Sequence, residues 1–285
     1  MADSSDRLIP LDPDRVALLA DTHISGDPKQ FVYGTQWPGS PIKPDEHEGV
    51  IMADCLAHVV RDVISQNPRP GHAIVNGDCA LSSGHSEEYR EFIRLLKPMR
   101  EAGIIVHITI GNHDNRTRLW QEIPGLKREQ VGRHVGVVEL PKVNLLLLDT
   151  GQGDLGEEQL VWLGDRLGLP GKKPILAFAH INPYRRPGTR PIKGHRDGAS
   201  LLQLLTHRKN VKALFYGHTH NWTVERWVDV HMINQPPVSY CFGKGDPNGW
   251  IDMRLTDAGG DLELRCINEK HPRHKERHRL LWREG

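Results

Sequence analysis

Short polar motifs rich in histidine and aspartate follow apolar runs at five places in this chain of 285 residues. They are Asp21-Thr22-His23, Gly77-Asp78, Gly111-Asn112-His113-Asp114, His180 and Gly217-His218-Thr219-His220. Their potential ligand atoms are nitrogens and oxygens, which suit Mn, Fe, Co or Zn better than a metal selected by thiolates. The motifs therefore indicate a transition-metal site, provided that the fold brings them together.

Each motif by itself also has an ordinary explanation. Aspartate and histidine after a strand are common turn residues, a Gly-Asn pair is a frequent turn, and a single His180 is more often a hydrogen-bonded core histidine. His218 and His220 point the same way in an extended segment, so they could serve one site, or two adjacent ions if the turn splays them. Five such motifs at strand ends are much harder to explain by chance than any one alone.

The apolar runs predict strands, and amphipathic segments between them predict helices. The expected strands lie at 15–21, 72–78, 104–114, 144–150, 174–180 and 211–220, and the expected helices lie at 48–66, 86–103 and around 157–167. Pro98 is expected to interrupt the second of these helices and Gly103 to end it. Alternating strands and helices favour a mostly parallel sheet with helices on its faces. In such sheets, sites form at the carboxyl ends of the strands.

The C-terminal part of the chain has a different pattern. The segments 223–233, 238–242, 250–256 and 261–267 alternate between apolar and polar residues without helices between them, which predicts antiparallel strands. The mixed charges after them predict a solvated or loosely docked tail, with a basic docking arm as a minor alternative. We therefore expect one domain over residues 1–268 and a charged tail over 269–285.

Two long loops should lie beside the motifs. The glycine- and proline-rich loop at 26–46 contains Tyr33 and Trp37, which could stack on a base, although anchoring of the loop is the more ordinary role. The loop at 181–198 carries the basic residues Arg185, Arg186, Arg190, Lys193 and Arg196. Arginine side chains suit phosphate oxygens, but a solvated basic loop explains them equally well.

Composition excludes several classes of protein. Hydrophobic residues are 38% and charged residues 26%, which is typical of a soluble globular protein, and the net charge of +1 recruits neither a nucleic-acid polymer nor a membrane surface. The four cysteines form no CxxC pair, so free thiols in a reducing compartment are expected. No apolar stretch could span a bilayer, and the polar N-terminus resembles no signal peptide. These observations favour the cytoplasm.

In their order along the chain, the motifs resemble those of the calcineurin-like metallophosphoesterase superfamily, over roughly Arg15 to His220. The resemblance implies an α/β fold in which a two-sheet mixed β-sandwich is flanked by helices. The segments after His220 fit the second sheet of that fold. The metal site lies at the carboxyl ends of the strands and contains two ions, here Mn, Fe, Zn or Co.

Carried onto this sequence, the resemblance implies a role for each motif residue. Asp21, His23 and His220 would hold one ion, Asn112, His180 and His218 would hold the other, and Asp78 would bridge them. Two ions about 3.5–4 Å apart need a shared anionic bridge, lower the pKa of a bound water and clamp the oxygens of an ester. His113 would lie over the substrate rather than bind a metal, and Asp114 would orient its imidazole.

Residues near Asp78 and Asp114 favour one branch of the superfamily. Purple acid phosphatases carry a ligand tyrosine where this chain has Leu81, and protein Ser/Thr phosphatases carry GDxxDRG and GNHE where it has GDCALSSG and GNHD. The stretches GDCALSSG and GNHD of this chain resemble the class III cyclic nucleotide phosphodiesterase and glycerophosphodiesterase-like branch. Ile181, where that branch commonly has a second histidine, is a departure, as is the long separation of Asp21 from Asp78. The substrate-binding residues expected from these stretches and the basic loop are Asn112, Arg116, Arg185 and Arg186.

The expected function is hydrolysis of a small-molecule phosphodiester, such as a cyclic nucleotide or a glycerophosphodiester, by a metal-bound hydroxide. One alternative is a phosphomonoesterase or lipid-headgroup hydrolase with the same centre. A weaker alternative is a non-catalytic binding scaffold, against which the presence of all seven proposed ligands argues. The sequence leaves open the identity of the ester and the oligomeric state, with a homo-oligomer among the possibilities.

Overall fold

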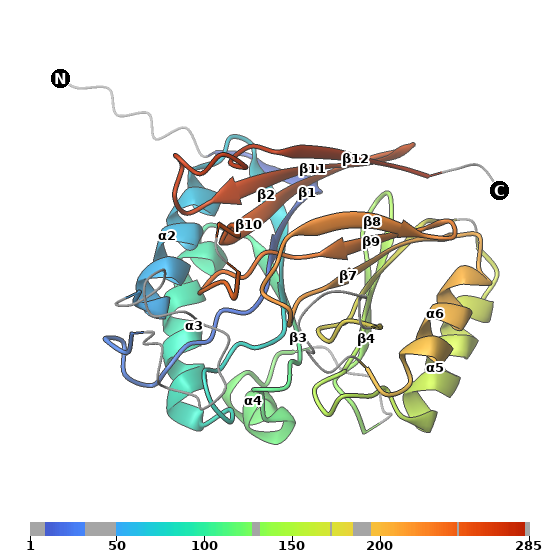
Figure 1. The fold of residues 1–285 in the computed structure, drawn as a ribbon, viewed down its shortest axis with the longest axis horizontal. Coiled ribbons are helices and arrows are strands. Elements are labelled where there is room, and N and C mark those ends of the chain that lie inside the picture. The colour runs from blue at the N-terminus through green and yellow to red at the C-terminus, as the bar shows by residue number, and fades with distance from the viewer. Residues whose placement is uncertain are drawn as a thin grey trace.

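The computed structural model describes residues 9–31, 50–126, 132–171, 173–184, 195–243 and 245–282, and Figure 1 shows how their elements are arranged. Two six-stranded sheets form the centre of the molecule, and helices lie on their outer sides (Figure 1). Several residues of the two long loops lie outside the described residues: Tyr33, Trp37, Arg185, Arg186, Arg190 and Lys193.

The first sheet has the strand order β12-β11-β10-β1-β2-β3. Its strands are β1 (Leu11–Leu19), β2 (Arg69–Asn76), β3 (Ile105–Thr109), β10 (Gly249–Thr256), β11 (Gly259–Cys266) and β12 (Arg277–Leu281). β1, β2 and β3 run parallel, whereas β10, β11 and β12 form an antiparallel meander that joins β1. The three parallel strands therefore end at the same edge of the sheet.

The second sheet has the strand order β4-β5-β6-β7-β9-β8. Its strands are β4 (Gly136–Glu139), β5 (Asn144–Leu147), β6 (Ile175–Phe178), β7 (Val211–Tyr216), β8 (Thr223–Trp227) and β9 (Val230–Asn234). β5, β6, β7 and β9 are parallel, and β4 and β8 pair antiparallel at the two edges. This sheet also gathers the carboxyl ends of its central strands on one side.

Apolar packing joins the layers. On the first sheet lie α2 (Met52–Ser65) and α3 (Ser86–Glu101), the short α4 (Arg116–Glu122) follows β3, and α5 (Glu157–Gly168) and α6 (Gly198–Thr206) cover the second sheet. The face of α2 that carries Leu56, Val59 and Val63 is completely buried, because these residues recur at helical spacing. A separate apolar cluster, which includes Phe178 and Phe215, fills the space between the sheets.

The predicted fold class is confirmed, since two mixed sheets flanked by helices make up the described chain. The interruption expected at Pro98 is wrong, because α3 continues through this residue to Glu101. Proline removes one intrahelical N–H donor. The buried side chains of Leu95, Leu96 and Met99 pack on either side of it and keep the last turn in place.

The strand expected at 238–242 is absent, since this segment is an irregular loop. Its backbone pairs instead with the end of β1: Val238 N–H donates to Ala20 O at 2.9 Å, and Ser239 N–H donates to Asp21 O at 3.2 Å. The loop therefore lies along the edge of the sheet at which the first polar motif begins.

The C-terminal segment differs from the expected solvated or loosely docked tail. Residues Arg277–Leu281 form β12, which pairs with β11, and Leu280 is completely buried. Arg277 and Arg279 form ion pairs with Glu263 and Asp261 across the strands. The expectation of a tail is wrong for β12, while the domain division at residue 268 stays a prediction.

The cysteines are free, as the composition predicts, and the described helices are not of the membrane-spanning kind. Cys55, Cys79, Cys241 and Cys266 are free and buried. Within the described ranges, every helix is too short or too polar to cross a membrane.

Candidate metal centre

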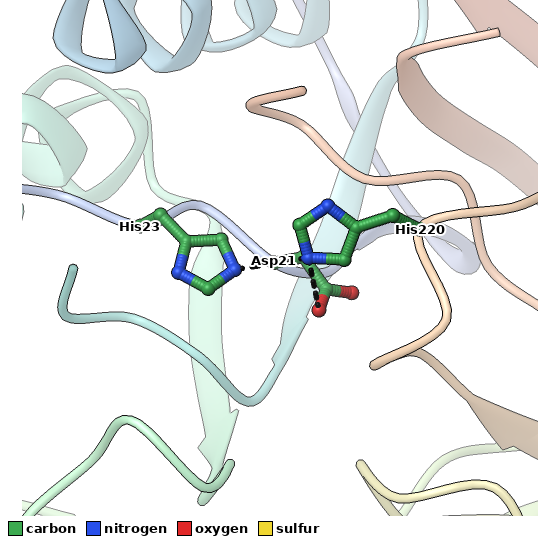
Figure 2. A group of neighbouring side chains, drawn as sticks. All are labelled: Asp21, His23 and His220. Carbon is green, nitrogen blue, oxygen red and sulfur yellow. Dashed lines mark hydrogen bonds and ion pairs between the residues drawn. The ribbon is translucent and has the colours of Figure 1, made fainter. Parts of the chain in front are cut away.

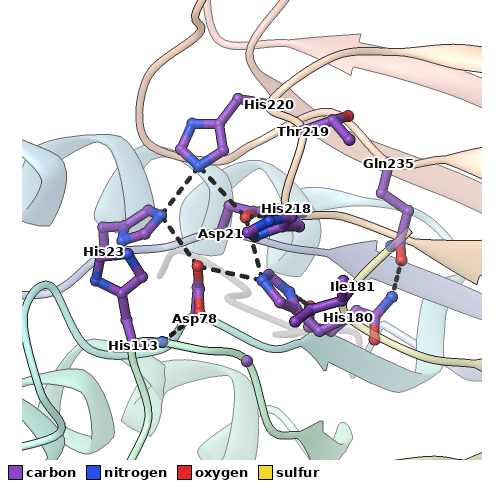
Figure 3. Close-up of polar contacts among 12 residues, drawn as sticks. Asp21, His23, Asp78, His113, His180, Ile181, His218, Thr219, His220 and Gln235 are labelled. Atoms are coloured by element: carbon purple, nitrogen blue, oxygen red, sulfur yellow. Dashed lines mark hydrogen bonds and ion pairs between the residues drawn. The ribbon is translucent and has the colours of Figure 1, made fainter. Parts of the chain in front are cut away.

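The polar motifs meet at the carboxyl ends of strands from both sheets, and Figure 3 shows their side chains converging. Three groups of potential ligand atoms each lie within 4.8 Å of one another: Asp21, His23 and His220; Asp78, His180 and His218; and His23, Asp78 and His113. Figure 2 shows the first of these groups. Most of these side chains are nearly or completely buried. The fold thus brings together the six proposed ligands that are aspartate or histidine.

The backbone at these residues adopts an unusual conformation. Seven described non-glycine residues have positive φ, and five of them are Asp21 (52°), His23 (48°), Asp78 (49°), His218 (65°) and His220 (51°). The left-handed region costs a residue with a side chain about 1 kcal/mol or more. A concentration of such residues in one place is typical of a functional site, where the surrounding structure imposes the conformation.

Two glycines of the motifs leave space for the proposed ligands. Gly77 has a φ of 77°, and a Cβ at this position would lie 2.6 Å from the ring of His180. A Cβ at Gly217 would lie 2.4 Å from Oδ2 of Asp21. Both distances are shorter than any normal contact, so a larger residue would displace a proposed ligand.

The carboxylates also organise the loops that carry the other motifs. Oδ1 and Oδ2 of Asp21 accept the backbone N–H of His218 at 3.1 and 3.2 Å, which joins β1 of the first sheet to the loop after β7. Oδ1 of Asp78 accepts the backbone N–H of His113 at 2.9 Å. These bonds to charged acceptors fix the approach of the motifs to one another.

Backbone carbonyls set the orientation of three histidine rings. Nδ1–H of His180 donates to Asn76 O at 2.8 Å, Nδ1–H of His220 donates to Tyr240 O at 2.6 Å, and Nδ1–H of His113 donates to Leu81 O at 2.6 Å. In each ring this leaves Nε2 on the side of the shared centre. Metal-binding histidines in proteins are oriented by the same kind of bond to the ring nitrogen that does not bind the metal.

The spacing of the donor atoms fits a metal ion. Nε2 of His180 lies 3.1 Å from Oδ2 of Asp78, and Nε2 of His23 lies 3.0 Å from Nε2 of His220. Ligand atoms about 2.1 Å from one ion lie roughly 3.0–3.4 Å apart in tetrahedral or octahedral geometry. Among the described residues, the buried Nε2 of His180 makes this ion-pair contact with Asp78 but no hydrogen bond of normal geometry. These donors therefore fit a transition-metal ion in both chemistry and spacing.

Burial and charge give the histidines different pKa values. Burial lowers the pKa of His218 to about 4, and the neighbouring His180 contributes to this shift. Burial also opposes a charge on His180, but the carboxylates of Asp78 and Asp21 raise its pKa to about 10. The pKa of Asp78 lies well below its usual value, because burial is outweighed by His180 and other nearby imidazoles. Without a metal, a proton on His180 thus supplies the positive charge between the two carboxylates.

The expected pairing of Asp114 with His113 is wrong. The Asp114 carboxylate accepts backbone N–H groups of Cys79, Ala80 and Gly111 at 3.2, 3.1 and 2.9 Å. It therefore joins the loop after β2 to the loop after β3, while the Leu81 carbonyl orients the imidazole. A buried carboxylate gains more from three donors fixed by the backbone than from one neighbouring ring.

Asn112 and Arg116 lie near the candidate ligands in the chain, but their predicted roles remain predictions. The Asn112 side chain is exposed at the tip after β3, and its roles as a ligand and as a substrate contact stay predictions. Arg116 forms a two-bonded ion pair with the buried Asp149, so a contact between its guanidinium and substrate stays a prediction as well. Ile181 is buried beside His180 (Figure 3).

Sequence reasoning missed the groups that support the candidate ligands. The carbonyls of Asn76, Leu81 and Tyr240 carry no sequence signal, because every residue has one. Phe242 was also missed, although its ring stacks on that of His220 with centroids 4.1 Å apart and an interplanar angle of 7°. The sequence pattern of residues 238–242 predicts a strand, whereas the structure packs the rings of Tyr240 and Phe242 from this segment against that of His220.

A two-sheet α/β sandwich with nitrogen and oxygen donors gathered at the carboxyl ends of its strands is the architecture of a metallophosphoesterase. Residues 14–222 match the family described as calcineurin-like phosphoesterase, and the chain belongs to this family.

Two proteins with similar sequences are named as phosphodiesterases. The chain is 26% identical over 214 residues to the glycerophosphodiester phosphodiesterase GpdQ of Enterobacter lignolyticus, covering 67% of this chain and 73% of that protein. It is 25% identical over 227 residues to the 3′,5′-cyclic adenosine monophosphate phosphodiesterase CpdA of Pseudomonas aeruginosa, covering 74% and 79%. The names of these relatives confirm the resemblance to the glycerophosphodiesterase and cyclic nucleotide phosphodiesterase branch.

Among solved structures, a dimetal phosphatase from Danio rerio is similar with a TM-score of 0.69 and 16% identity, over 95% of this chain and all (100%) of that one. The purple acid phosphatase PPD1 of yellow lupin is similar with a TM-score of 0.60 and 12% identity, over 92% of this chain and 52% of that one. At these identities the likeness shows the fold alone.

Proposed function

We propose that this protein is a phosphodiesterase that uses two transition-metal ions and acts on a small-molecule phosphodiester. The observation that supports the proposal most directly is the convergence of seven aspartate and histidine side chains on one centre, in three overlapping groups whose ligand atoms lie within 4.8 Å of one another. The names of the sequence relatives favour a diester over a monoester. Membership of the family supports hydrolysis as the reaction.

In this proposal the ligands divide between two ions as the motifs imply. Asp21, His23 and His220 would hold one ion, Asn112, His180 and His218 would hold the other, and Asp78 would be the shared ligand. When bound, such a pair of ions polarises the phosphoryl group and lowers the pKa of a coordinated water. Asp78 suits the shared position because its carboxylate lies near both sides: Oδ2 is 3.1 Å from Nε2 of His180 and 3.6 Å from Nε2 of His23.

His113 is the proposed general acid. Its backbone N–H is bound to Asp78, and its Nδ1–H is bound to the Leu81 carbonyl, so both backbone and ring are held in place. Nε2 then faces the shared centre, beside the ring of His23 at a centroid distance of 4.8 Å. From this position Nε2–H would give its proton to the leaving oxygen as the P–O bond breaks, which leaves an alcohol and a neutral imidazole.

Hydrolysis of bis- and mono-p-nitrophenyl phosphate, cyclic nucleotides and glycerophosphodiesters by Mn²⁺-loaded protein tests the substrate class. We expect diesters to have the higher kcat/KM. Higher kcat/KM for the monoester would contradict the diester assignment, and bound metal without turnover of any ester would indicate a binding scaffold. Asp78→Asn should retain fewer ions per chain than the unaltered protein by elemental analysis, since the shared charge is removed.

The role of His113 is tested with leaving groups of different basicity. His113→Ala should keep its metal content, because its ring is not a proposed ligand, and should lose more rate on alkyl esters than on p-nitrophenyl esters. General acid catalysis typically contributes about 10²–10⁴-fold, and a basic leaving oxygen needs it most. Equal losses on both kinds of ester would make His113 an electrostatic contact, and a loss of metal would make it a ligand, as its group with His23 and Asp78 allows.

A further inference from the structure

A chain of buried amide and hydroxyl groups crosses from one sheet to the other beside the candidate metal centre. Oγ1 of Thr109, at the end of β3, donates to Oδ1 of Asn76 at 2.8 Å. Nδ2 of Asn76, at the end of β2, donates to Oε1 of Gln235 at 2.6 Å, and Figure 3 labels Gln235. Gln235 follows β9 of the second sheet, and all three residues are 0% exposed.

Asn76 contacts the second sheet at several further points. Its Nδ2 lies 3.3 Å from Phe215 O of β7 and 3.4 Å from Ala179 O, directly after β6. Its own backbone carbonyl accepts Nδ1–H of His180 at 2.8 Å. Asn76 precedes Asp78 by two residues, so one residue connects the strand that carries Asp78 with the strand ends that carry His180 and His218.

The apolar surroundings make the burial of these amide and hydroxyl groups energetically unfavourable. The space between the sheets is otherwise filled with apolar side chains, including Ile74, Phe178 and Ile233. Among the described residues, the completely buried Nε2 of Gln235 has no hydrogen-bond partner. A buried polar group without a partner costs about 1–3 kcal/mol. An apolar residue of similar size would avoid that cost, so packing alone does not account for an amide at this position.

We propose that Asn76 and Gln235 are positioning residues that set the placement of the second sheet relative to the first at the metal centre. The hydrogen bond between their side chains fixes the lateral position of β2 against β9. The Asn76 carbonyl then fixes the ring of His180, whose Nε2 lies 3.1 Å from Oδ2 of Asp78. Directional hydrogen bonds specify this lateral position, whereas apolar contacts would allow the two sheets to slide against each other. The inference rests on the proposed two-metal site.

Gln235→Met tests the proposal, because methionine keeps the length of the side chain and removes the acceptor for Asn76. We expect Mn²⁺ to bind this variant about 10–100-fold more weakly, as is typical when a partner of a metal ligand is lost. We also expect kcat for bis-p-nitrophenyl phosphate at saturating Mn²⁺ to fall with little change in KM. Titration calorimetry with Mn²⁺ gives the affinity without any measurement of activity.

Gln66→Met is the matched control. Gln66 accepts a hydrogen bond from Arg15 and donates to Asp62 at the end of α2, before β2 begins and away from the motifs. The control should lose stability without losing Mn²⁺ affinity. An unchanged Mn²⁺ affinity in Gln235→Met would overturn the proposal, whatever the change in its stability. No Mn²⁺ binding by the unaltered protein would instead overturn the proposed function.

A double-mutant cycle separates joint from independent action. If the two side chains act through one hydrogen bond, Asn76→Ala combined with Gln235→Met should bind Mn²⁺ no more weakly than Asn76→Ala alone. Multiplicative losses in the double variant would show that the residues act separately and would overturn the proposal. If Asn76→Ala does not fold, Asn76→Ser replaces it in the cycle.

Discussion

Arg116 and Asp149 form a two-bonded ion pair that joins the two sheets beside the His113 loop. Nε of Arg116 donates to Oδ2 of Asp149 at 2.6 Å, and Nη2 donates to Oδ1 at 3.0 Å. Arg116 begins α4, directly after the loop that follows β3 of the first sheet, whereas Asp149 follows β5 of the second. The Asp149 side chain is 0% exposed and also accepts the backbone N–H of His134 at 2.8 Å.

Arg116→Met should therefore destabilise the protein through the carboxylate that it leaves behind. Loss of one partner from a buried ion pair costs about 3–5 kcal/mol, and we expect the lower end because Arg116 is 18% exposed. Urea unfolding of the metal-free protein measures the change. Arg118→Met on the same helix is the control, because its guanidinium bonds only to the Gly84 carbonyl among the hydrogen bonds found for the described residues. Unchanged stability with a raised KM in Arg116→Met would favour the substrate contact expected from the sequence.

Metal binding should release a proton from His180. The carboxylates of Asp78 and Asp21 raise its pKa to about 10 against the opposing effect of burial, so the metal-free protein carries this proton at pH 7. A metal ligand must be unprotonated. Calorimetric titration with Mn²⁺ in buffers of different ionisation enthalpy should detect the release, and Mn²⁺ affinity should rise about tenfold per pH unit from pH 7 to 9. Binding without proton exchange would contradict this assignment.

The same proton predicts how the stability of the metal-free protein depends on pH. The pKa of His180 is raised in the folded state, from 6.5 to about 10. Its contribution is therefore complete below pH 6.5 and is lost as pH rises toward 10. The free energy of unfolding of the metal-free protein should fall over this window, and the fall should be smaller in His180→Gln. Parallel curves for the two proteins would show that His180 is neutral in the metal-free fold.

Gly77→Ala should impair metal binding at the candidate centre. The added methyl group would lie 2.6 Å from the ring of His180 and would occupy a left-handed backbone conformation with φ of 77°. We expect a loss of roughly 1–3 kcal/mol in stability together with weaker Mn²⁺ binding. Gly164→Ala within α5 is the matched control, since the nearest atom to its Cβ is 4.0 Å away. The control should gain up to about 1 kcal/mol from helix propensity. Equal Mn²⁺ affinity in both variants would contradict the crowding at His180.

Glu276 should contribute to the loop that carries His220 a small stabilisation that is lost in acid. Hydrogen bonds from Arg273 lower the pKa of Glu276 to about 2 against burial, and His278 and Trp222 assist. Because the folded-state pKa is lowered from 4.5, the contribution is present above pH 4.5 and lost as pH falls toward 2. The stability difference between the unaltered protein and Glu276→Gln should shrink over this window, as measured by urea unfolding. A difference that does not vary with pH would show that the carboxylate charge is unimportant.

The amino-acid sequence by itself determined which residues could form the candidate metal centre. His180 and Asp78 each follow a run of apolar residues, and a strand that ends in a polar residue delivers that residue to the edge of a parallel sheet. This inference needs only local periodicity, so it succeeded for both sheets. The sequence pattern also correctly indicated antiparallel strands at β10 and β11, because their alternation is equally local. The segment 223–233, expected as one strand, is instead divided by a turn into β8 and β9, and β9 pairs parallel with β7.

Only the tertiary structure decided how those residues are held. The carbonyls of Asn76 and Tyr240 orient His180 and His220, yet a carbonyl is common to all residues and has no pattern in the sequence. Asp114 lies next to His113 in the chain, but its carboxylate binds N–H groups of another loop, because three fixed donors outweigh one flexible neighbour. The bond between Asn76 and Gln235 joins residues 159 positions apart, and such a pairing exists only after the sheets have packed.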